Sequence, residues 1–166
     1  MKPAGSDAFL EGVYREHGHV VLRRARSLLG SEQDAWEALQ ELFLSLLDRP
    51  EQISDPSSLT GFLYKATTNL CLNRIRDRAT RARLLDQHVA PKEDELRVEG
   101  PRAERLVILR ELLARLPDDL ACAAVYFYGD EMTHDEIAKQ LGCSRRHVGN
   151  LLERLHETVR AGESQS

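Results

Sequence analysis

Long apolar runs, paired cysteines and glycine-rich loops are all scarce in this sequence. No apolar run approaches the roughly 20 residues that cross a bilayer, and the opening stretch MKPAGSDAFL lacks the apolar core of a secretory signal. The three cysteines, Cys71, Cys122 and Cys143, form no CxxC pair, which argues against a disulfide framework or a zinc knuckle. We therefore expect a cytoplasmic protein that has buried thiols, no membrane contact and no metal or other cofactor.

Patterns typical of catalysis are missing as well. The six histidines are scattered, no glycine-rich loop is present that would cradle a phosphate, and no carboxylate pair stands out from ordinary surface charge. We predict no catalytic residues and no enzyme.

Charge is abundant but unevenly distributed. The formal net charge is −4, which on its own disfavours a nucleic-acid partner, because phosphate binding depends on Lys and Arg. Residues 31–55, however, carry seven acidic side chains against the lone Arg49, whereas residues 65–83 carry six basic side chains against Asp77. Adjacent segments of opposite charge indicate two different partners.

Apolar residues recur at helical spacing along most of the chain, and this pattern predicts an all-α fold. A first helix is expected over 7–29, ending at Gly30. A second helix begins at Ser31, where Asp34 three residues later completes a start that resembles a capping box, and it ends before Pro50. Its apolar stripe comprises Ala35, Leu39, Leu42, Phe43, Leu46 and Leu47.

The third predicted helix follows a loop rich in proline and serine. Its apolar face comprises Leu59, Leu63, Ala66, Leu70 and Ile75. The stretch QHVAPKEDELRVEG (87–100) then has mixed charge and few bulky residues, as flexible tethers do. We expect two small helical domains, 7–85 and 101–160, joined by a flexible linker over 86–100. Pro101 suits a first helical turn, and the next stripe comprises Leu106, Leu109, Leu113 and Leu116, before Pro117.

Residues 133–155 have the pattern of a helix-turn-helix. Thr133 and Glu136 form a T-x-x-E capping box, Gly142 permits a left-handed turn, and Ser144 can cap the next helix. Residues predicted to pack inward are Ile137, Ala138, Leu141, Val148, Leu151, Leu152 and Leu155.

The first turn of the second helix then points outward, toward a DNA major groove. The predicted DNA-binding residues here are Ser144, Arg145, Arg146, His147, Asn150 and, at the backbone, Arg154. The alternative is a packed helical hairpin with a solvated pair of arginines.

Three stretches resemble the extracytoplasmic-function sigma factors. LLARLPDDLACAAVYFYGDEMTHDEIAKQLGCS resembles their region-four signature, and FLYKATTNLCLNRIRDR resembles the helix after region two, with Asn69 in place. DAWEALQELFLSLL resembles the region-two motif, and the residues identical to that motif are Asp34, Ala35, Gln40, Glu41 and Phe43. The resemblance covers about 9–160, with region two in the first domain and region four in the second.

The resemblance implies that the chain binds core RNA polymerase through the beta-prime clamp and the beta flap. An anti-sigma factor is a further expected partner. The implied polymerase-binding residues are Asp34, Glu37, Gln40, Glu41, Phe43 and Leu47 on the acidic helix. From the residues alone, this helix is equally consistent with a solvated face plus a core Phe43.

Promoter DNA is the second implied partner. The resemblance assigns capture of a flipped base in the minus-ten element to the loop that contains Ser54, Asp55 and Ser57. Asn69 reads a base edge or holds this loop. Arg74 and Arg76, within the basic run, would grip phosphates; a solvated basic tail is the alternative.

The chain departs from the family pattern at several positions. Trp36 replaces an acid, Thr68 replaces a common arginine, and Gly149 replaces a common lysine in the recognition helix. The resemblance as a whole nevertheless implies a non-enzymatic transcription initiation factor. A helix-turn-helix regulator that acts without being a polymerase subunit remains the main alternative, and a helical scaffold protein is the third.

Overall fold

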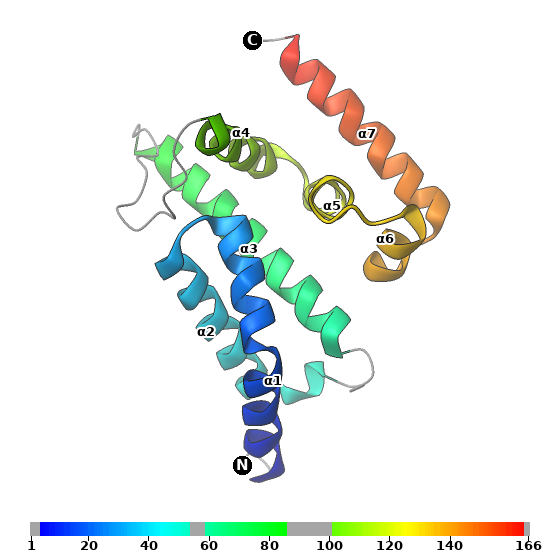
Figure 1. The fold of residues 1–166 in the computed structure, drawn as a ribbon. Helices are drawn as coiled ribbons and strands as arrows, with labels where there is room; N and C mark the ends of the chain where they lie inside the picture. The colour runs from blue at the N-terminus through cyan, green and yellow to red at the C-terminus, as the bar shows by residue number, and fades with distance from the viewer. Residues whose placement is uncertain (1–3, 54–58, 86–100, 165–166) are drawn as a thin grey trace. The chain divides into compact units, whose positions relative to one another are not determined.

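The computed structural model describes residues 4–53, 59–85 and 101–164. Their regular structure is helical, and no strand forms in these ranges, so the predicted all-α fold is confirmed (Figure 1). The chain divides into two compact units, Met1–Arg110 and Glu111–Ser166. This division falls inside α4 (Pro101–Arg115), whereas the predicted linker, 86–100, lies outside the described residues.

The first helix ends, and the second helix begins and ends, where local sequence signals predict, whereas the first helix begins three residues before its predicted start. Helix α1 (Ala4–Leu29) stops at Gly30, which has a φ of +66° and donates its N–H to the carbonyl of Arg26 at 2.9 Å. Only glycine adopts this left-handed conformation without strain. Helix α2 (Glu32–Asp48) is capped by Ser31, whose hydroxyl accepts the N–H of Asp34 at 3.2 Å.

Helix α3 (Leu59–Leu84) buries part of the predicted face: Leu59, Leu63 and Ile75 are buried, as predicted. Ala66 and Leu70 are only half-buried, while Thr67, Thr68 and Cys71 lie in the core. The two threonine hydroxyls donate to the carbonyls one turn earlier, at 2.6 and 2.8 Å. This bonding satisfies the polar atoms, so threonine can be buried as a small β-branched core residue.

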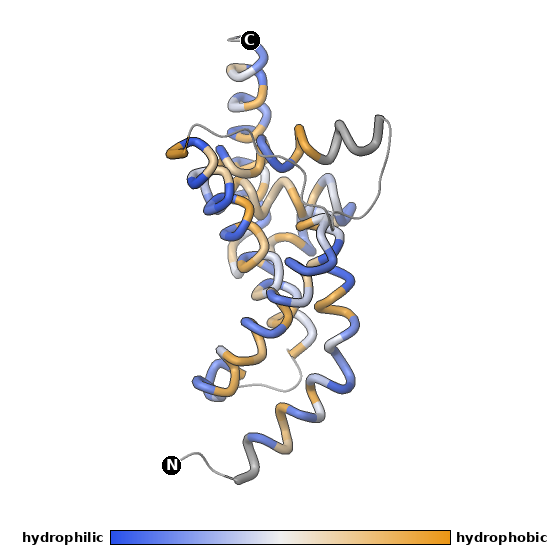
Figure 2. The backbone as a smooth tube through the Cα atoms, turned by 90° about the vertical axis from the view of Figure 1, so that its left-hand side faces the viewer, coloured by the Kyte–Doolittle hydropathy of each residue, from blue (hydrophilic) through white to orange (hydrophobic). Residues whose placement is uncertain are grey.

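The first unit is built on contacts among α1, α2 and α3. Helix α1 packs against both α2 and α3, and α2 also contacts α3. Figure 2 shows orange and blue alternating along each helix, as amphipathic helices require. The largest fully buried residues here are Leu39, Leu46, Thr67, Thr68 and Cys71.

The second unit contains the C-terminal end of α4 and the helices that follow. Helix α5 (Asp118–Ala124) runs into a short π-helical turn, η3 (Val125–Gly129). Helices α6 (His134–Leu141) and α7 (Arg145–Glu163) complete the unit, and α7 packs against both α5 and α6.

The core of this unit was predicted well except in α4. Leu113 and Leu116 are buried, but Leu109 is exposed, and the side chain of Leu106 lies outside the described residues. The predicted inward residues of the last two helices are buried, apart from the half-buried Leu141. Tyr126, from the π-helical turn, is the largest of the fully buried side chains.

Candidate nucleic-acid and protein interfaces

Helix α6 begins with a complete capping box. The hydroxyl of Thr133 accepts the N–H of Glu136 at 3.2 Å, and the Glu136 carboxylate accepts the N–H of Thr133 at 2.7 Å. The bonds from the Thr133 backbone and side chain lower the pKa of Glu136 below its ordinary value. The helix ends at Gly142, whose φ of +68° gives the predicted left-handed turn.

Helix α7 presents its first turn to solvent. The Ser144 hydroxyl caps it by accepting the N–H of His147 at 3.1 Å. Residues from the opposite face hold the helix to the unit: Val148, Leu151, Leu152 and Leu155 are all buried. The predicted DNA-binding side chains are consequently exposed, namely Ser144, Arg145, Arg146, His147, Asn150 and Arg154.

Two of these arginines are paired with acids from other helices of the same unit. Arg145 Nη1 lies 3.5 Å from Asp135 Oδ2 on α6, and Arg154 Nη1 lies 3.4 Å from Asp119 Oδ2 on α5. Both pairs are at the surface, where an ion pair adds little stability. Their effect is to orient the two guanidinium groups and to offset part of their charge.

The predicted polymerase-binding residues of α2 lie on two different faces. Glu37, Gln40 and Glu41 are exposed, Leu47 is half-buried, and Asp34 and Phe43 are buried. The Phe43 ring packs edge-on against Tyr14 of α1, with centroids 5.0 Å apart. The exposed residues are therefore the ones that a partner can reach without unfolding the helix.

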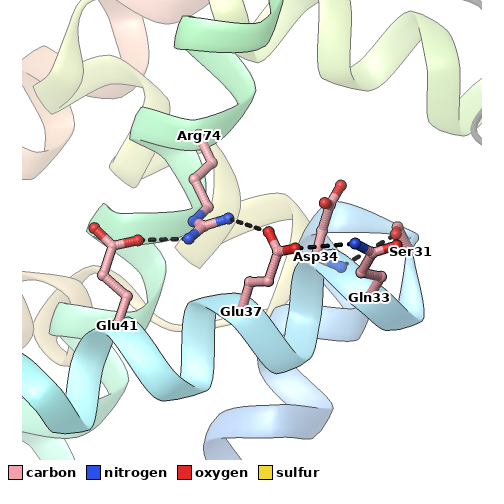
Figure 3. Close-up of polar contacts among 6 residues, drawn as sticks. All are labelled: Ser31, Gln33, Asp34, Glu37, Glu41 and Arg74. Atoms are coloured by element: carbon pink, nitrogen blue, oxygen red, sulfur yellow. Dashed lines mark hydrogen bonds and ion pairs between the residues drawn. The ribbon is translucent and has the colours of Figure 1, made fainter.

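Arg74 connects the acidic helix to the basic one. Figure 3 shows its guanidinium between two carboxylates of α2: Arg74 Nη2 donates to Glu41 at 2.5 Å, and Nη1 donates to Glu37 at 3.4 Å. Glu37 also accepts a bond from Gln33 at 3.1 Å. Burial acts to lower the pKa of Arg74, but the bonds to Glu41 and Glu37 outweigh it, and the pKa is raised. Arg74 thus stays charged and bound between the helices.

Comparison with known proteins matches both units. Models of Sigma-70 region 2 and Sigma-70 region 4 match residues 13–81 and 106–155. The ECF RNA polymerase sigma factor SigE of Mycolicibacterium smegmatis is 28% identical over 149 residues, which are 86% of this chain and 55% of that protein. SigL of Mycobacterium tuberculosis, another ECF RNA polymerase sigma factor, is 27% identical over 161 residues, 95% of this chain and 89% of that protein. The chain belongs to the extracytoplasmic-function sigma factors.

A third relative shows how coverage varies. The probable RNA polymerase sigma factor RfaY of Xanthomonas campestris is 28% identical over 152 residues, 85% of this chain but 36% of that protein. The chain thus spans about half or less of the length of two of these relatives. Sigma factors are non-catalytic subunits of RNA polymerase, and the prediction that this chain is not an enzyme agrees with the family match.

The remaining predicted residues of region 2 are only partly described. Asn69 is exposed on α3 and Arg76 is half-buried, whereas Ser54, Asp55 and Ser57 lie outside the described residues. Phe62 of the same helix is half-buried. The structure therefore brings Asn69, Arg74 and Arg76 onto one helix of this sigma factor and leaves their contact with DNA as a prediction.

Sequence reasoning missed two features of region 2. Arg24 of α1 donates to the Thr68 hydroxyl through Nε and Nη2, at 3.3 and 3.2 Å, and stacks over the Tyr64 ring at 4.4 Å. A guanidinium thus lies beside Thr68, where the family commonly has an arginine. No local sequence pattern predicts this contact, because Arg24 and Thr68 are 44 positions apart.

The second missed feature is an apolar stripe on α2. Trp36 and Leu44 are 42% and 61% exposed, one turn on either side of Gln40. The Trp36 indole N–H also donates to Glu32 at 3.1 Å. Both residues lie four positions from Gln40 in the sequence, but Trp36 departs from the family motif there and Leu44 falls inside that motif, so neither marks an exposed apolar stripe.

The described ranges offer neither a cluster of metal ligands nor a helix suited to a membrane span. Among those residues, no group of three or more His, Cys, Asp or Glu side chains is arranged to hold a metal ion. No helix of the described chain is both long and apolar enough to span a membrane.

Proposed function

We propose that the chain is a transcription initiation factor that binds core RNA polymerase and directs it to specific promoters. The observation that carries the proposal is the presence of region 2 and region 4 in order, the second with a capped helix-turn-helix that exposes two adjacent arginines. Such a factor acts where RNA polymerase transcribes, in the cytoplasm. By family resemblance, an anti-sigma factor is a further proposed partner.

In this proposal the chain performs two tasks with separate segments. Region 2, within residues 7–85, binds the beta-prime clamp and the minus-ten element, and region 4, within 101–160, binds the beta flap and the minus-thirty-five element. Residues 86–100 are the proposed linker. This division agrees with the matched family models at 13–81 and 106–155.

The proposed polymerase face of α2 is its exposed side. Gln40 lies at the centre, Glu37 and Glu41 form one edge, and Trp36 and Leu44 extend the face along the helix. A patch with an apolar strip beside an acidic edge suits an amphipathic partner helix that carries basic residues. Asp34 and Phe43 support this face from below rather than touching the partner.

The proposed DNA contacts lie on α3 and α7. On α3, Asn69 would meet a base edge and Arg76 would meet phosphates. On α7, the first turn offers side chains to the major groove, while Arg154 lies two turns further along, where a backbone contact is expected.

Charge distribution favours a polymerase subunit over an independent regulator. Residues 111–166 carry six Lys and Arg against ten Asp and Glu, so the entire net charge of −4 lies in the unit that holds the DNA reader. A net negative unit gains little from counterion release when it meets DNA alone. Binding to polymerase would supply the missing affinity by holding the reader near the promoter.

Reconstitution with core RNA polymerase tests the proposal. The chain should form a stable complex with core polymerase and produce transcripts from specific sites in a fragmented genomic template. Core polymerase alone serves as the control. If instead the chain binds a symmetric duplex site as a dimer and fails to bind core polymerase, the regulator alternative is correct.

A further inference from the structure

The two adjacent arginines that open α7 have different surroundings. Arg145 is paired with Asp135, whereas Arg146 has no ion pair with any residue in the described ranges. Both are exposed and both begin the same helix, but adjacent helical positions point about 100° apart, so the two side chains face different neighbours. The difference comes from α6, which places a carboxylate beside only one of them.

Asp135 is held in place independently of DNA. It is the second residue of α6, directly between Thr133 and Glu136 of the capping box that fixes the start of this helix. Ile137 and Ala138 anchor α6 in the core, and α6 packs against α7. The carboxylate therefore has a defined position relative to Arg145, although its side chain is 71% exposed.

The chemistry of the two possible DNA contacts differs. A bidentate contact to a guanine needs a guanidinium whose plane and direction are set, because two N–H groups must meet O6 and N7 together. A phosphate contact depends mainly on net positive charge and tolerates many orientations. In the first turn of α7, which is proposed to enter the groove, a carboxylate beside an arginine restricts its rotamers and offsets its charge, which favours the first contact and weakens the second. Arg154 is also paired with an acid, but it lies two turns further along α7, where only a backbone contact is expected.

We infer that Asp135 positions Arg145 as the base-reading arginine of the recognition helix, and that Arg146 holds a phosphate. Asp135 binds one end of the guanidinium, through Nη1, and leaves the other donors for a base edge. Arg146 keeps its full charge for the backbone. This inference rests on the proposed function, because it assigns roles within the minus-thirty-five contact.

The test is a selection of preferred minus-thirty-five sequences from a randomised duplex library by holoenzyme. The variants are Arg145→Ala, Arg145→Lys, Arg146→Ala and Asp135→Asn. Glu153→Gln is the matched control, since Glu153 is an exposed acid on α7 that loses the same charge and makes no contact with Arg145. Core-polymerase binding of each variant is measured first, and all are expected to bind as the wild type does.

Each variant has a distinct expected result. Arg145→Ala should reduce discrimination at one base pair by roughly 5- to 150-fold, and Arg145→Lys should do the same while keeping most of the affinity. Asp135→Asn should relax the same base pair by about two- to fivefold, the range for an exposed ion pair. Arg146→Ala should weaken all sequences alike and reduce the salt slope by about one. Glu153→Gln should leave the preference unchanged.

Three results would overturn the inference. If Asp135→Asn leaves the preference at the base pair that Arg145 reads unchanged, Asp135 does not position the arginine. If Arg146→Ala relaxes one base pair while Arg145→Ala weakens all sequences alike, the two roles are reversed. If Glu153→Gln relaxes the same base pair as Asp135→Asn, loss of charge and not positioning is the cause. By contrast, a wild-type chain that fails to bind core polymerase contradicts the proposed function itself.

Discussion

Arg74 on α3 donates to the carboxylate of Glu41 on α2 across a distance of 2.5 Å. The pair joins a residue predicted to bind DNA to a residue predicted to bind polymerase. Neither side chain is free to act alone, since moving Glu41 toward a partner would release Arg74, and the reverse also holds. The acidic helix α2 and the basic helix α3 are therefore joined by an ion pair. They cannot be treated as two independent charged surfaces.

Gln40 offers the cleanest test of the polymerase face. It is exposed on α2 beside Glu41, so Gln40→Ala should weaken core-polymerase binding by about 1–2 kcal/mol while leaving the unfolding free energy within about 0.5 kcal/mol of the wild type. Binding is measured by titration with labelled core polymerase and stability by urea unfolding. Unchanged affinity would reject Gln40 as a contact.

Glu41→Lys is expected to behave differently from Gln40→Ala. A lysine there would face Arg74, so this variant should lose up to about 1 kcal/mol of stability in addition to affinity. Glu51→Lys, which makes the same charge change at an exposed site outside α2, is the matched control. Equal losses of affinity in both variants would assign the effect to overall charge.

Trp36 and Leu44 provide a second prediction about the same face. Tryptophan is among the residues that most often contribute strongly to the affinity of an interface, and Leu44 adds apolar area on the same face, so the double variant Trp36→Ala with Leu44→Ala should lower core-polymerase affinity by about tenfold or more. Phe9→Ala is the control, because Phe9 is 43% exposed on α1, close to the 42% of Trp36. If Phe9→Ala lowers core-polymerase affinity by a similar factor, the effect does not depend on the position of Trp36 and Leu44 on α2.

The helix caps show which parts of the fold were predictable from sequence. Three helix caps use a hydroxyl that accepts the backbone N–H three residues later: Ser31, Thr133 and Ser144. Because the two partners are close in the sequence, these bonds can be predicted from it. The pairing of Arg74 with Glu41 joins residues 33 positions apart and depends on how α2 and α3 pack. The contact between Arg24 and Thr68 was not predicted for the same reason: it depends on how α1 and α3 pack.

Burial was predicted less well than helix position. A threonine counts as polar in a periodicity argument, yet Thr67 is fully buried because its hydroxyl bonds within the helix. Leu109 shows the opposite error, since it continues the apolar stripe of α4 but is exposed. Of the candidate site, the outward turn of α7 followed from the helix-turn-helix pattern, whereas the acids that pair with its arginines required the tertiary structure.

Two glycines of region 4 should respond to alanine in opposite directions. A Cβ at Gly149 would meet no atom within 4 Å, and the residue lies inside α7 with ordinary helical geometry. Gly149→Ala should therefore stabilise the protein by up to about 1 kcal/mol. Gly142 has a φ of +68°, so Gly142→Ala should destabilise it by about 1–2 kcal/mol. Urea unfolding of the full chain measures both, and a loss of stability in Gly149→Ala would contradict the assigned geometry.

The capping box of α6 predicts a pH dependence with a defined sign. The pKa of Glu136 is lowered from its ordinary value of 4.5, so its charged form is favoured in the folded state. The contribution to stability is complete above that ordinary pKa and is lost as the pH falls through the lower pKa of the folded state. Glu136→Gln, which keeps an acceptor for the Thr133 N–H, should be less stable than the wild type at pH 7, and the difference should shrink toward pH 3. A difference independent of pH would exclude the carboxylate charge as the cause.

The acidic balance of region 4 predicts that the free chain binds promoter DNA poorly. The first turn of α7 exposes two arginines, but Asp135 offsets part of the charge of Arg145. Asp119 likewise offsets part of the charge of Arg154, further along α7. Without polymerase, binding to a duplex should be no tighter than the roughly 10⁻⁴–10⁻⁶ M of non-specific contacts at physiological salt. With core polymerase the same duplex should bind at least about a hundredfold more tightly, because the reader is then held beside its site.

Fluorescence anisotropy with a labelled duplex, recorded for the free chain and the holoenzyme over a range of salt, measures both affinities, and a duplex of scrambled sequence is the control. Tight, sequence-specific binding by the free chain would mean that its arginines overcome the surrounding acids unaided, and would favour a regulator that needs no polymerase.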